Sequence, residues 1–162
     1  MRNLSFILLL VMVSCNTASP DNEELKSENT GGNEQAAKDW LMKAIPDFFE
    51  STEMDLNTIA TPEYAEYKSD AMNILYGELT IPMFEQKWKG KFDVSDNAVG
   101  KAFLIDGEDY VKIEVVSCEL ISTSEKGWKF STKLIDKAMN MEVARQIDVI
   151  PFADAYRISD VK

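Results

Sequence analysis

The stretch Lys101–Asp136, KAFLIDGEDYVKIEVVSCELISTSEKGWKFSTKLID, decides the fold class of this chain. It contains three runs rich in β-branched and aromatic residues, separated by turn signals at Asp106-Gly107 and at residues 124–127. Apolar residues alternate along the long middle run, which is typical of a strand that buries one face. We therefore predict an antiparallel sheet built around this stretch.

The middle run changes phase halfway along its length. Its apolar residues are first Val111, Ile113 and Val115, and then Val116, Cys118 and Leu120. A slip of one residue predicts a β-bulge between Val115 and Val116, because a strand otherwise turns its whole apolar set to the other face. Bulges bend a strand, so we expect a curved sheet.

Two helices are predicted before the sheet from apolar residues at helical spacing. The first begins at Glu34 with Asn33 as its cap and contains Pro46, where it should bend or restart. The second opens with Thr61 as cap and Pro62 at the first helical position, and one short turn over residues 55–60 precedes it. Gly77 indicates where it stops.

Aromatic side chains on these helices have two possible roles. Trp40, Phe48 and Phe49 could line a ligand cavity, although a stripe at this spacing favours a place in the core. The tyrosines of the second helix, Tyr64, Tyr67 and Tyr76, could donate hydrogen bonds into a pocket or simply lie at the rim of the helix face.

Further strands are predicted on both sides of the central stretch. They are residues 87–94, 102–105, 128–134, 143–150 and 156–161. In the first of them Trp88, Phe92 and Val94 would face one way, and a row of lysines the other. Such a row could meet an anionic partner, but it also discourages edge pairing, and we favour the second role.

Composition excludes several classes of function. The 162 residues carry a formal charge of −11 and are 45% hydrophobic, which suits one globular domain. An acidic surface repels phosphate backbones, so nucleic acid is not expected as a partner. The chain has no histidine, which excludes a Ser-His-Asp triad and the commonest zinc sites. We predict no metal and no cofactor, and no catalytic residue can be assigned.

The N-terminus MRNLSFILLLVMVSC is typical of a secretory signal, since its apolar run is too short to span a membrane. Its end, Met12-Val13-Ser14-Cys15, resembles the lipobox of bacterial lipoproteins. The resemblance implies that Cys15 is lipidated, with acyl chains such as palmitate, and becomes the first mature residue. The alternative is a plain signal peptide cut later, with Cys15 removed or paired with Cys118. If Cys15 is lipidated, we expect Cys118 to act as a small buried hydrophobe.

Residues 16–33 predict a disordered acidic tether, because they are almost free of apolar side chains. The segment Ser19-Pro20-Asp21-Asn22-Glu23-Glu24 resembles the acidic export signal of Bacteroidetes lipoproteins. The alternative is an ordinary acidic linker, which would have the same composition. We therefore divide the chain into a signal peptide (1–14), a lipidated cysteine with its tether (15–33) and a single α+β domain (34–162).

The predicted order of helices followed by a bulged antiparallel sheet resembles the nuclear transport factor 2-like superfamily, with its cystatin-like cone. The entry Gly127-Trp128-Lys129-Phe130 and the ending Tyr156-Arg157-Ile158-Ser159-Asp160-Val161 are similar to motifs of small bacterial lipoproteins with that fold. The resemblance implies a curved sheet and helices that enclose a pocket. Some members use the pocket for acid–base chemistry, and others only for binding.

These features together predict a lipid-anchored protein of the bacterial cell envelope with a small, non-catalytic binding or assembly domain. We expect it on the outer membrane, at the periplasmic face or the cell surface. The expected partners are the membrane, through the anchor, and a protein or a small apolar ligand. The alternatives are an acid–base enzyme that uses Asp and Tyr in the cone, and an inhibitor or immunity-type partner of another protein.

Overall fold

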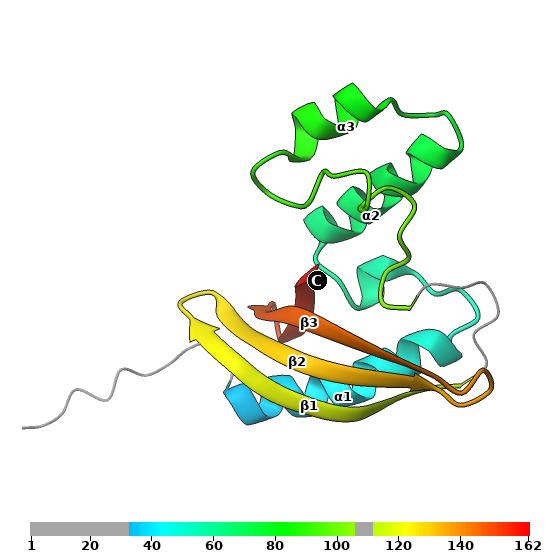
Figure 1. The fold of residues 1–162 in the computed structure, drawn as a ribbon. Coiled ribbons are helices and arrows are strands. Elements are labelled where there is room, and N and C mark those ends of the chain that lie inside the picture. The colour runs from blue at the N-terminus through cyan, green and yellow to red at the C-terminus, as the bar shows by residue number, and fades with distance from the viewer. Residues whose placement is uncertain (1–32, 106–111) are drawn as a thin grey trace, which may run out of the picture.

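A computed structural model describes residues 33–105 and 112–162, and Figure 1 shows their arrangement. Helical elements come first and an antiparallel sheet follows, which confirms the α+β class. The elements are α1 (Glu34–Glu50), the 3-10 helix η1 (Leu56–Thr58), α2 (Pro62–Leu75), α3 (Ile81–Trp88), β1 (Ile113–Ser124), β2 (Gly127–Asp136), β3 (Met141–Phe152) and β4 (Ala155–Val161). The sheet has the order β1-β2-β3-β4 and is open.

Helix α1 lies along one face of the sheet, which we call the inner face (Figure 1). Its cap is Asn33, whose side chain accepts a hydrogen bond from the amide of Ala36, and the helix runs unbroken through Pro46. The space between helix and sheet is filled by fully buried side chains, among them Leu41 and Ile45 from α1 and Phe130, Leu134, Ile147 and Val149 from the sheet. The aromatic stripe of α1, which is Trp40, Phe48 and Phe49, packs in or against this core, which was the favoured prediction.

Strand β1 contains two bulges. The register with β2 shifts between Val115 and Ser117 and again between Leu120 and Ser122, which leaves Val116 and Ile121 as the extra residues. Both extra side chains are exposed. The first bulge is the predicted one. The second has no clear signal in the sequence, because Leu120 and Ile121 are both apolar and hide the change of phase.

The three hairpins of the sheet turn close to where the sequence predicts. β1 and β2 are joined by the turn at Glu125-Lys126, and the last two predicted strands exist with slightly wider bounds. The uncertain crossing before β3 is a tight turn over residues 137–140. The predicted turn at Asp106-Gly107 lies outside the described residues.

Two strand predictions are wrong. Residues 81–88 form helix α3, so the alternation from Trp88 to Val94 is not a strand; Phe84 and Trp88 are buried one helical turn apart instead. The lysine row does not form an open face, because Lys87 and Lys91 make ion pairs with carboxylates of α2. Residues 102–105 form no strand either, although Leu104 and Ile105 are buried.

Helices α2 and α3 pack on each other and reach the sheet through β4 (Figure 1). We call these two helices and the loop that follows them, residues 62–103, the arm. Thr61 caps α2 as predicted, since its hydroxyl accepts a hydrogen bond from the amide of Tyr64 at 3.2 Å. Gly77 lies just beyond the helix with a φ of 75°, which a glycine adopts without strain.

A pair of isoleucine truncations in β1 tests the assignment of its buried face. Ile113 is 3% exposed and packs in the core, so Ile113→Ala should lower the free energy of unfolding by about 2–5 kcal/mol. The matched change Ile121→Ala removes a bulge side chain that is 46% exposed and should cost less than about 0.5 kcal/mol. Urea unfolding of both variants measures the difference, and equal losses would show that the inner face is misassigned.

Candidate functional site

Two hollows lie between the arm and the sheet, and both contain polar side chains. One is a groove of about 740 Å³ on the face of the sheet opposite α1, which we call the outer groove. The other is a more enclosed hollow of about 580 Å³ between α2 and the ends of β3 and β4, which we call the α2–β4 pocket. Their chemistry differs.

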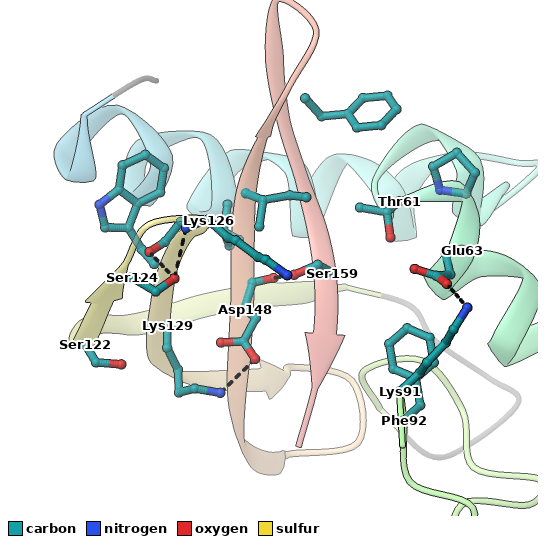
Figure 2. A pocket seen from close by; sticks show the side chains of 16 residues that line it. Thr61, Glu63, Lys91, Phe92, Ser122, Ser124, Lys126, Lys129, Asp148 and Ser159 are labelled. Atoms are coloured by element: carbon teal, nitrogen blue, oxygen red, sulfur yellow. Dashed lines mark hydrogen bonds and ion pairs between the residues drawn. The ribbon is translucent and has the colours of Figure 1, made fainter. Parts of the chain in front are cut away.

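Figure 2 shows the outer groove, whose charged groups are mostly paired. Lys129 of β2 forms an ion pair with Asp148 of β3 at 2.7 Å. On the arm, Lys91 forms one with Glu63. The groove is broad and its ion pairs are already satisfied, so it offers a ligand little unused charge.

The α2–β4 pocket collects residues from α2, from the loop after α3 and from the ends of β3 and β4. Its lining consists of Tyr64, Tyr67, Lys68, Asp93, Ala98, Lys101, Ala102, Phe103, Arg145, Asp160, Val161 and Lys162. Among the lining residues that the structure describes, four side chains are basic and two are acidic, whereas the chain as a whole carries a formal charge of −11. The described part of the lining is therefore locally cationic on an acidic protein.

Two tyrosines of α2 form one wall of the pocket. Tyr64 and Tyr67 are 2% and 5% exposed and their rings lie 5.6 Å apart, so they are core residues as well as lining residues. The hydroxyl of Tyr67 donates to the backbone carbonyl of Asp93 at 2.7 Å. Burial raises the pKa of both phenols, that of Tyr67 to about 12, so both stay protonated donors at neutral pH.

A buried lysine lies next to the two tyrosines on α2. Lys68 is only 6% exposed, and its ammonium donates to the backbone carbonyl of Lys101 at 2.6 Å. This bond ties α2 to the loop that carries Lys101 and Phe103. A buried ammonium needs such partners, because its desolvation is otherwise costly. The positive charge is thereby fixed at the pocket.

Asp160 of β4 is the carboxyl group of the pocket with the most unusual environment. It accepts hydrogen bonds from the Val161 amide at 2.9 Å and from the Lys162 ammonium at 3.2 Å. Burial nevertheless raises its pKa above the usual range; Lys162 and the Val161 amide oppose this rise, and Asp148 adds to it. Asp160 therefore keeps its proton to a higher pH than an ordinary aspartic acid.

The two hollows are linked by a pair of carboxyl groups on neighbouring strands. Asp148 of β3 and Asp160 of β4 are register partners, and like charges at such positions destabilise a sheet. Each has its own cation, Lys129 for Asp148 and Lys162 for Asp160. Asp148 lines the outer groove, and Asp160 lines the pocket.

Sequence reasoning identified some members of this site and missed others. Tyr64 and Tyr67 were considered as phenolic donors and do line the pocket, whereas Tyr76 is 73% exposed and lies elsewhere. Asp160 belongs to the terminal motif of residues 156–161, and no pattern in the sequence marks it as a site residue. Cys118 is buried as expected, and burial raises its pKa to about 11, which makes it a poor nucleophile. Cys15 lies outside the described residues.

An apolar cluster lies at the far end of the arm. Four large side chains at the α2–α3 junction are exposed, Leu75, Tyr76, Ile81 and Met83. Exposed apolar clusters of this kind occur at protein interaction sites. The hypothesis of a protein partner therefore keeps one structural observation in its favour.

The pH dependence of stability tests the environment of Asp160. Because its pKa is raised in the folded state, the native protein holds this proton more tightly than the unfolded chain, and stability is lost as pH rises through the folded pKa. Asp160→Asn removes this loss. The variant should therefore gain stability relative to the wild type as pH increases from about 3 to about 7.

Urea unfolding across that pH range measures this effect. Asp154→Asn, in the exposed turn between β3 and β4, is the matched control and should follow the wild-type curve. Parallel curves for Asp160→Asn and the wild type would contradict the assignment.

Comparisons with known proteins give no family for this chain. No protein-family model, no curated protein and no solved structure matches it at a significant level. Among the described residues no helix is long and apolar enough to cross a membrane. The resemblances drawn from the sequence therefore stay predictions.

Proposed function

We propose that this protein is a lipid-anchored cell-envelope protein whose domain binds a small molecule in the α2–β4 pocket without transforming it. One observation carries the binding function: among the described residues, two buried phenols, four basic groups and two carboxyls, of which Asp160 has a raised pKa, surround a single hollow. Ligand sites typically combine an apolar wall with a few convergent polar groups, and this pocket has both.

The proposal includes the nuclear transport factor 2-like cone as its finer fold. The order of helices before a bulged antiparallel sheet supports it. One feature differs from the expected cone, because the hollow between α1 and the inner face is filled by side chains. The ligand would therefore lie beside the sheet, between the arm and β4, rather than under α1.

The anchor at Cys15 is the second part of the proposal. A lipidated N-terminal cysteine has about three acyl chains, and each buried CH₂ contributes about 0.8 kcal/mol, so several chains hold a protein on a membrane stably. Removal of the signal peptide takes away Arg2 and changes the formal charge from −11 to −12. Anionic lipids repel a chain of this charge, so electrostatic attraction cannot hold it on the membrane. The burial of Cys118 supports the anchor over a disulfide with Cys15, since a buried thiol is inaccessible to a partner. We place the anchor at the outer membrane, at the periplasmic face or the surface, on the resemblance of residues 19–24 to the acidic export signal.

An acid–base enzyme is the second candidate, and Asp160 favours it. The Val161 backbone hydrogen-bonds both the Asp160 carboxyl and the Tyr64 phenol, so two proton-carrying groups meet at one place. Carboxylic acids with raised pKa values serve as general acids in enzymes. The two candidates differ in outcome: an enzyme releases a changed molecule, and Asp160→Asn abolishes that change, whereas a binding domain returns its ligand intact.

Blocking the pocket tests the binding function. In Ala102→Phe a benzyl group would occupy the space beside Phe103, so ligands should no longer raise the melting temperature. Ala155→Phe, which adds the same group at an exposed strand end, is the matched control and should respond like the wild type. The measurement is a thermal-shift screen of full-length protein in detergent against anionic, neutral and cationic metabolites. If no compound stabilises the wild type more than Ala102→Phe, the pocket does not bind small molecules.

Replacing the lipidated residue tests the anchor. Cys15→Ser should block lipidation, so the protein should appear as an unprocessed precursor or as a soluble secreted form. The core is built from residues between Ala37 and Ile158, so the melting temperature of the domain should not change. Mass spectrometry of the native N-terminus decides the question. An unmodified chain that begins beyond Cys15 would overturn both the anchor and the localisation.

A further inference from the structure

We propose that the ligand of the α2–β4 pocket is a small organic acid, whose carboxylate lies between Asp160, Tyr64 and Lys162 and whose apolar body packs against Phe103. The inference rests on the proposed binding function and names its ligand class. It predicts in addition that binding takes up a proton.

The charge of the pocket favours an anion. Lys101 and Lys162 are exposed at its mouth, and the Lys68 ammonium is fixed in its wall. Asp93 also lines the hollow, and its pKa is lowered mainly by a hydrogen bond from the Ser95 backbone, so it remains an anion on one side. Among the described lining residues, four basic groups still outnumber two acidic ones. An anion that enters from solution is attracted to them, although the rest of the acidic surface repels it.

The apolar surface favours an organic body over an inorganic ion. The ring of Tyr64 lies 6.2 Å from that of Phe103, and Ala98 lines the hollow near them. Inorganic phosphate would leave this wall uncovered. In an organic acid, a flat or branched apolar group can cover this wall while the carboxylate reaches the polar end of the hollow. Ligands in concave sites commonly combine the two kinds of contact.

Asp160 selects a carboxylate through its proton. Protonated Asp160 can donate O–H···O⁻ to the incoming carboxylate, which is among the strongest hydrogen bonds in proteins. The proton stays on Asp160, and Tyr64 can donate a second bond. Ionised Asp160 would instead repel the carboxylate, so the complex at higher pH must first take one proton from water. Affinity should therefore fall about tenfold per pH unit above the pKa of Asp160.

The neighbours of Asp160 whose pKa shifts are resolved do not produce the same pH dependence. The charged and titratable groups that face it or line the same hollow are Lys162 on β4, Asp148 and Arg145 on β3, Tyr64, Tyr67 and Lys68 on α2, and Asp93 and Lys101 on the loop. Wherever a shift is resolved among them, it moves the group away from neutral pH: the pKa of Asp93 falls, and those of the two tyrosines rise. The pKa of Asp160, by contrast, is raised toward neutral pH.

The test uses benzoate, its neutral analogue benzyl alcohol, and inorganic phosphate, titrated into the full-length protein in detergent at pH about 4, close to the ordinary pKa of an aspartic acid, and at pH about 8. Benzoate should bind at the lower pH and at least about tenfold more weakly at the higher one, and neither other probe should bind. In Asp160→Asn the side-chain amide donates at every pH, so benzoate affinity should become independent of pH. The control Asp154→Asn should keep the wild-type dependence.

A second variant covers the case in which Asp160→Asn does not fold. Tyr64→Phe removes one hydroxyl and should weaken benzoate binding about tenfold while leaving its pH dependence intact. The inference is overturned if the wild type binds benzoate equally at both pH values, or if it binds phosphate in place of benzoate. Either result leaves the proposed function standing. If the metabolite screen also finds no ligand of any charge, the proposed function fails as well.

Discussion

The site depends on a short backbone pairing between the start of the arm and the edge of the sheet. The amide of Thr61 donates to the carbonyl of Ile158 at 2.8 Å, and the amide of Ile158 donates to the carbonyl of Ile59 at 2.9 Å. Thr61 also caps α2 through its side chain, so one residue fixes both the sheet contact and the start of the helix. Because Tyr64 follows one turn later, the pairing places its hydroxyl beside the last residues of β4.

The same pairing explains why the two edges of the sheet differ. β4 is covered along part of its length by residues 59–61, whereas β1 has no neighbouring strand on its outer side among the described residues. An uncovered edge invites pairing with another chain, and bulges are one way in which proteins prevent this. β1 carries two, at Val116 and Ile121. The two bulges, of which only the first is visible in the sequence, therefore also protect this strand.

Local patterns predicted the parts of the fold that depend on local chemistry. The predictions are correct for the caps Asn33 and Thr61 and for the alternation along β2, because neighbours along the chain determine these features. Helix α3 was missed, because its buried face consists of only two residues, Phe84 and Trp88, and the alternation that suggested a strand begins at its last residue. The pocket could not be predicted, since it joins Tyr64 to Asp160 through tertiary packing. No short-range pattern links two residues so far apart in the chain.

Asp160 makes little sense as a stabilising residue. It lies opposite Asp148 across two strands, it is largely withdrawn from water, and its only ion-pair partner among the described residues is the exposed Lys162. An asparagine or threonine would satisfy the Val161 amide without these costs. A residue that conflicts with its surroundings is expected where function requires it. The phenol of Tyr64 and the basic groups near Asp160 could contact the same ligand as this carboxyl. The same conflict is what makes its proton available, because only a carboxyl that resists ionisation can donate to an anion at a pH where ordinary carboxyls repel it.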